Sequence, residues 1–61
     1  MPSDESRRLL KAFGVAVTEF EDLVHRHESV DKVNQAEATV RSRLEELTAW
    51  IERLRRHAAA A

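Results

Sequence analysis

The sequence predicts an all-α fold, a two-helix antiparallel hairpin that self-associates into a four-helix bundle. In two separate stretches, apolar residues alternate at intervals of three and four, the spacing that places side chains on one face of a helix. Between the stretches lies a short polar break, from His27 to Asp31, across which the register of the apolar positions shifts by one residue. Because no Gly or Pro marks this break, a single long helix in a coiled coil is the alternative.

The first helix is expected over residues 4–27. Ser3 is suited to cap its first turn, and Asp4 and Glu5 suit the positive end of the helix dipole. Its main apolar stripe consists of Leu10, Phe13, Val17, Phe20, Val24 and His27. Three further apolar residues fall beside this stripe and widen it: Leu9, Ala16 and Leu23. A stripe of this width is typical of a helix in a bundle, whereas a two-stranded coiled coil needs only a narrow one.

A turn is expected over residues 28–30, followed by a second helix over residues 31–58. Either Ser29 or Asp31 can cap this second helix. Its apolar stripe is preceded by Val30 and Val33 and consists of Val40, Leu44, Leu47, Ile51, Leu54 and Ala58. Trp50 flanks the stripe. At 1.5 Å per residue the two helices reach roughly 36 and 45 Å, so the second is expected to extend beyond the first.

Self-association is expected because one copy of the chain is too small to cover its own apolar surface. The 61 residues form at most one domain, and a chain of this length buries only about 60% of the surface that its unfolded form exposes. Since the chain has no cysteine, no disulfide reinforces it. Packing two hairpins together closes a four-helix core. The residues predicted to mediate this homo-oligomer are Leu10, Phe13, Val17, Phe20, Val24, Val40, Leu44, Leu47, Trp50, Ile51 and Leu54.

The distribution of charge predicts how two hairpins are oriented. Where the termini of a hairpin meet, six cations face three acids, whereas the half near the turn carries six acids and two cations. An antiparallel dimer would therefore place each basic end beside an acidic one. The six cations are also the candidate residues for contact with an anion or a nucleic acid: Arg7, Arg8, Lys11, Arg53, Arg55 and Arg56.

The sequence favours a small helical protein–protein interaction module, a regulator or adaptor that acts as a homo-oligomer. The alternatives are a nucleic-acid-binding regulator that uses the basic end of the hairpin, or an accessory subunit of a larger complex. The net charge of −1 argues against a general polyanion binder, so the expected partners are a second copy and another protein. The apolar runs are far shorter than the roughly 20 residues that span a bilayer. Because the acidic, polar N-terminus does not look like a signal peptide, a cytoplasmic protein is expected.

No catalytic residue, cofactor or metal is predicted. The chain has no Gly-rich phosphate loop, no arrangement of nucleophile and base, and no thiolate ligand. His25, with Asp22 and Glu21 three and four residues before it, is a candidate carboxylate–histidine metal pair. Because His25 lies on the outer side of the stripe and no second such motif exists, a solvated histidine beside two acids is the favoured interpretation.

Overall fold

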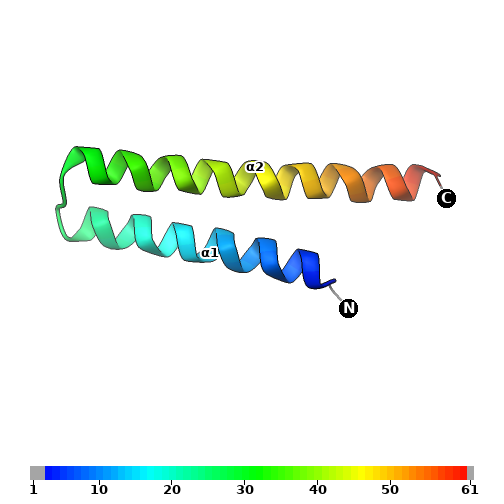
Figure 1. Ribbon diagram of the computed structural model, residues 1–61, viewed down its shortest axis with the longest axis horizontal. Coiled ribbons are helices and arrows are strands. Elements are labelled where there is room, and N and C mark those ends of the chain that lie inside the picture. Colours follow the sequence, from blue (N-terminus) through cyan, green and yellow to red (C-terminus); the bar gives the residue numbers. More distant parts are fainter. Residues whose placement is uncertain (1–2, 61) are drawn as a thin grey trace.

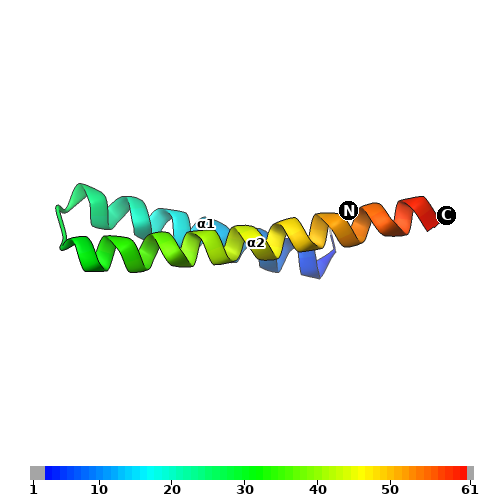
Figure 2. The same cartoon turned by 90° about the horizontal axis from the view of Figure 1, so that it is seen from above.

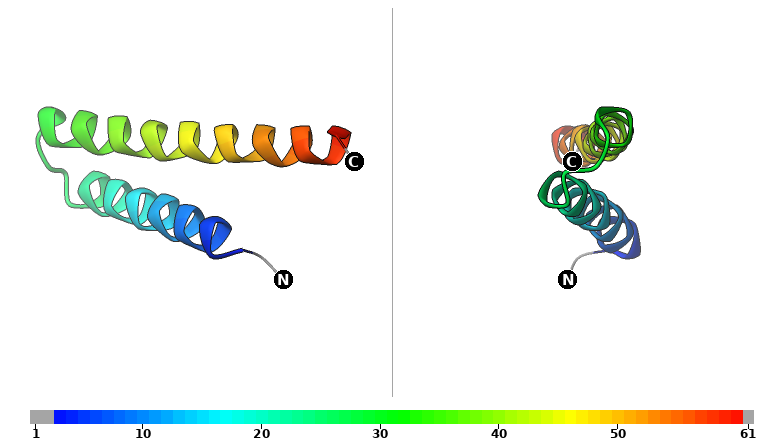
Figure 3. Two further views of the ribbon diagram at one scale, coloured as in Figure 1. Left: turned by 45° about the vertical axis from the view of Figure 1, so that its right-hand side comes forward. Right: turned by 90° about the vertical axis from the view of Figure 1, so that its left-hand side faces the viewer.

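The protein is a hairpin of two α-helices that lie side by side and run in opposite directions (Figure 1). The computed structural model describes residues 3–60, which contain helix α1, Asp4–His25, and helix α2, Val30–Ala60. Seen from above and from the end, the two helices form a single layer, and the molecule extends 49 × 19 × 11 Å (Figures 2 and 3). The predicted all-helical hairpin is confirmed, and the alternative of one long helix is wrong.

Helix α1 begins where its sequence predicts, at a serine cap. Ser3 has an extended backbone, and its Oγ accepts a hydrogen bond of 3.1 Å from the backbone N–H of Ser6. Asp4 and Glu5 lie in the first turn, where carboxylates interact favourably with the partial positive charge of the helix N-terminus. The cap therefore satisfies one of the N–H groups that have no partner within the helix.

The turn between the helices is built on His27, whose φ of 57° places it in the left-handed region. The N–H of His27 donates to the carbonyl of Val24, and the N–H of Glu28 to that of Leu23, both at 3.1 Å. This pair of hydrogen bonds is the Schellman motif, which ends a helix at a left-handed residue. Helix α1 therefore ends at His25, two residues before the expected position. His27 is exposed in the turn, so the expectation that it continues the apolar stripe is wrong.

Ser29 is the cap of helix α2. Its Oγ accepts a hydrogen bond of 3.3 Å from the N–H of Lys32, and its carbonyl accepts one of 3.0 Å from the N–H of Val33. Of the two candidate caps, the structure thus selects Ser29, and Asp31 lies inside the first turn of the helix.

The two helices meet along one line of side chains, which we call the hairpin seam. Leu9 and Ala16 are the buried residues of this seam, with 6% and 5% of their surfaces exposed. The half-buried apolar residues on either side of them are Ala12, Phe13, Phe20 and Leu23 from α1, and Val33, Ala36, Val40, Leu47 and Trp50 from α2. The row that was expected beside the main stripe therefore forms the centre of the contact within one chain.

Helix α2 extends beyond the beginning of α1, as its predicted length implies (Figure 1). It has 31 residues and α1 has 22, and the difference corresponds to about 13 Å at 1.5 Å per residue. Residues 51–59 are all exposed, and we call this segment the overhang. Among the described residues, neither helix combines the length and hydrophobicity needed to cross a bilayer.

Candidate self-association surface

Of the eight large aliphatic side chains that are exposed, six form two rows. One row lies on each helix: Leu10, Val17 and Val24 on α1, and Leu44, Ile51 and Leu54 on α2. Leu10 and Ile51 are the most exposed of the six, at 58% and 61%. All six belong to the residues predicted to mediate self-association. We call the surface that these two rows form the apolar face.

Helix geometry places both rows on the same side of the hairpin. Each residue of the α1 row directly follows a residue of the seam, so it is turned by about 100° from it. On α2, Leu44 and Ile51 likewise follow the half-buried seam residues Arg43 and Trp50. Because α2 runs opposite to α1, the residue that directly follows a seam residue points to the same side of the hairpin in both helices. The α1 row and the pair Leu44 and Ile51 therefore flank the seam along one broad surface. Leu54, seven residues after the seam residue Leu47, continues the line of the seam at its edge.

Four further residues predicted to mediate self-association lie between the two rows: Phe13, Phe20, Val40 and Leu47. Each is half-buried, because one side of it contacts the other helix of the hairpin. The exposed remainder of each adjoins the apolar face. These residues are thus placed to pack in two directions, as core residues of a four-helix bundle do.

The opposite side of the hairpin has a different character. A shallow groove there is lined by Ala12, Val15 and Ala16 of α1 and by Thr39 and Arg43 of α2. Charged side chains also border this groove: Arg8, Lys11 and Glu19. Val15 is 49% exposed, but it is an isolated exposed valine on this side, which needs no explanation. Charge thus borders the groove, while aliphatic side chains form the apolar face.

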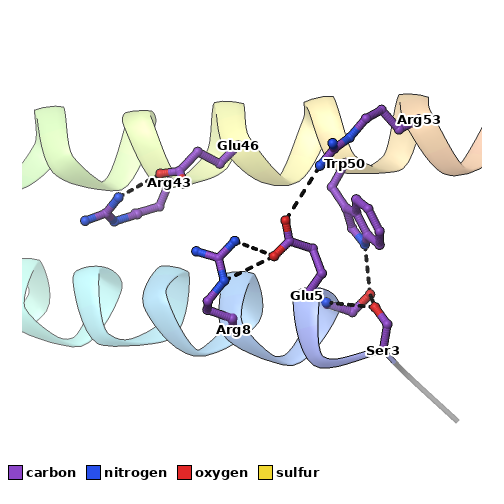
Figure 4. Close-up of polar contacts among 8 residues, drawn as sticks. Ser3, Glu5, Arg8, Arg43, Glu46, Trp50 and Arg53 are labelled. Carbon is purple, nitrogen blue, oxygen red and sulfur yellow. Dashed lines mark hydrogen bonds and ion pairs between the residues drawn. The ribbon is translucent and has the colours of Figure 1, made fainter.

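Trp50 joins the two helices near the N-terminus of α1 (Figure 4). Its Nε1–H donates a hydrogen bond of 2.8 Å to the Oγ of Ser6, and the Arg53 guanidinium lies 4.9 Å from the centre of its ring. Trp50 is thus half-buried by contacts within its own chain. Its predicted role in self-association stays a prediction. The sequence-based prediction missed Ser6, although the position of the turn aligns residue 6 with residue 50.

The six cations of the basic end do not form one free cluster. Glu5 pairs with Arg8 and also, at 3.6 Å, with Arg53 (Figure 4). The hydrogen bond that Arg8 donates to Glu5 and the negative charge of Glu5 raise the pKa of the Arg8 guanidinium. The other four cations form no ion pair with another described residue: Arg7, Lys11, Arg55 and Arg56. Three of the six cations lie in the first two turns of α1 and three on the overhang of α2, so they are spread over both helices.

The candidate metal pair around His25 does not gather further ligands. Asp22 forms an ion pair of 3.5 Å with Arg26, and the side chain of His25 is exposed. Within residues 3–60, no group of three His, Asp or Glu side chains is arranged to hold a metal ion. His25 is thus exposed, and the nearby carboxylate of Asp22 already pairs with Arg26.

Comparisons with known proteins found no matching family model, no matching curated protein and no matching solved structure.

Proposed function

We propose that the protein is a small helical interaction module that acts as a homo-oligomer, in which two hairpins join through their apolar faces into a four-helix bundle. The observation that carries this proposal is the row of exposed aliphatic side chains on each helix, both turned to one side of the hairpin. Contiguous apolar surface of this kind marks a site of protein association.

The width of the apolar surface favours a bundle over a simple hairpin. Leu9 and Leu10 are adjacent in sequence and both large, yet Leu9 is buried in the seam and Leu10 is exposed. A helix that contacts one neighbour needs only the first of these rows, whereas a helix with two neighbours uses both. Helix α2 repeats the pattern with Leu47 in the seam and Leu44 and Ile51 outside it. Each helix thus offers surface to a second neighbour.

The hairpin acts by binding. Leu9 and Ala16 are its buried apolar residues, and a single layer of two helices has little interior in which to enclose a substrate. A role as adaptor or regulator follows from a surface that brings chains together, and another protein would bind to a part of the bundle that the second copy leaves open.

Two valines of α1 provide a matched test, because they lie two residues apart and face opposite sides of the hairpin. Val17 belongs to the apolar face and Val15 borders the opposite groove, and both are exposed. Val17→Asp and Val15→Asp add the same charge to the same helix. Sedimentation equilibrium is expected to give a dimer for the parent chain and for Val15→Asp, and a monomer for Val17→Asp. A parent chain that is monomeric and melts cooperatively at micromolar concentration would overturn the proposal, as would equal effects of the two substitutions.

A further inference from the structure

We propose that two copies bind head to tail, so that the overhang of α2 in each copy covers the turn end of the other. This inference rests on the proposed self-association through the apolar face, and it names the surface at each end of the dimer. The overhang is residues 51–59. The turn end is residues 19–37, which comprise the last two turns of α1, the connection and the first two turns of α2.

When the helices of the two copies lie along one direction, as in a four-helix bundle, a twofold axis brings the two apolar faces together in only two arrangements. In the head-to-head arrangement, the axis runs along the helices and both turns lie at the same end. In the head-to-tail arrangement, the axis crosses the helices, and the turn of each copy lies beside the termini of the other. The two arrangements differ in what the overhang meets, so the composition of the ends distinguishes them.

Exposed apolar side chains occur at both ends of the hairpin. The overhang carries Ile51 and Leu54, and the turn end carries Val24 and Val30, of which Val30 is 73% exposed. Helix α1 reaches only the beginning of the overhang, where its Glu5 pairs with Arg53, and Leu54, beyond this pair, is 46% exposed. A head-to-tail partner brings the overhang over both helices of the turn end, so that three helices meet there. In the head-to-head arrangement, Val24 and Val30 can contact only the turn end of the other copy, and the overhang covers neither of them.

The charges of the two ends select the head-to-tail arrangement. The overhang contains three arginines and one acid, Glu52. Residues 19–37, around the turn, contain six acids and two cations. Both of these cations, Arg26 and Lys32, already pair with acids four residues before them, at 3.5 and 3.4 Å. Head-to-head packing therefore places arginines beside arginines, and head-to-tail packing places them beside acids.

Charges without a partner inside the chain occur on both of these surfaces. On the overhang, Arg55 and Arg56 form no ion pair with another described residue, and at the turn end the same holds for Glu21 and Asp31. Opposite charges at the edge of an apolar contact set orientation more than they add affinity. The ends of the hairpin thus recognise each other, and the apolar face supplies the contact.

Disulfide cross-linking distinguishes the arrangements, since the chain has no cysteine of its own. Ala58→Cys places a thiol on the overhang and Val30→Cys places one at the turn end, and both residues are exposed. The two variants are mixed, allowed to exchange and oxidised, and the linked peptides are identified by mass spectrometry. The head-to-tail dimer is expected to give links between position 58 of one copy and position 30 of the other, several-fold above links between identical positions.

Sedimentation of the reduced variants separates the two possible failures. Reduced chains that are monomeric overturn the proposed self-association, and with it this inference. Reduced chains that are dimeric but link position 58 mainly to position 58 overturn the head-to-tail arrangement alone. A dimer that forms neither kind of link also overturns it, because the overhang then covers no turn end. Dominant links between positions 58 and 30 support the inference.

Discussion

Replacing His27 by glycine is expected to stabilise the hairpin, because the turn requires a backbone conformation that suits glycine better than histidine. His27 has a φ of 57° and is exposed, so its side chain contributes little packing to offset the strain. The left-handed conformation costs a residue with a side chain about 1–2 kcal/mol. Glycine removes that cost but adds about 0.5–1 kcal/mol through its greater freedom in the unfolded chain. His27→Gly therefore stabilises the fold by about 0–1.5 kcal/mol, with a midpoint of about 0.7 kcal/mol.

His25→Gly is the matched control for this prediction. His25 is also an exposed histidine, but it is the last residue of α1 and has helical geometry. Glycine there is expected to destabilise the fold by about 0.5 kcal/mol, the difference in helix propensity between the two residues. The two substitutions remove the same side chain two residues apart, and their effects are opposite in sign.

Thermal and urea unfolding at one fixed chain concentration measure both effects. Circular dichroism follows the helices, and the fluorescence of Trp50, the chain's single tryptophan, follows contact at the far end of the hairpin. For a domain of this size, 1 kcal/mol shifts the melting temperature by about 4–8 °C, so a rise of a few degrees is expected for His27→Gly. A melting temperature below that of the parent would refute the assignment of a left-handed turn at His27. Equal shifts for the two glycine variants would refute it as well.

Two further predictions test the seam and the second cap. Leu9→Ala is expected to destabilise the hairpin by about 2–5 kcal/mol at every chain concentration, because it removes a buried side chain. Leu10→Ala, on the apolar face, is expected to reduce stability only at concentrations at which the chain dimerises, and melting curves over a hundredfold range of concentration compare the two. Ser29→Ala is expected to cost about 0.5–2 kcal/mol by removing the cap of α2. Ser42→Ala, in the exposed middle of the same helix, serves as the control in urea unfolding, and a loss of equal size there would contradict the role of Ser29.

Local signals in the sequence located the start of α1, and for α2 they left two candidate caps, Ser29 and Asp31, and an expected start one residue late. Ser3 and Ser29 act through side-chain hydrogen bonds to N–H groups three residues ahead, so a short window of sequence contains everything that their role requires. The end of α1 could not be located in this way. A left-handed residue is usually glycine, and with His27 in that position the sequence carried no mark of where the helix stops. The expected boundary was therefore two residues late.

Which of two adjacent apolar rows faces the other helix could not be decided from spacing alone. Leu9 and Leu10 are each followed by other apolar residues at intervals of three, four or seven. Each of the two rows could therefore form the stripe that contacts a facing helix. The turn decides between them, because the path of residues 26–29 fixes the rotation of α1 relative to α2, and it places the row of Leu9 inward. The row of Leu10 then remains exposed, although its residues are as large and apolar as those of a core. That surplus of apolar surface is a property of the folded hairpin, and in the proposed dimer a second chain would cover it.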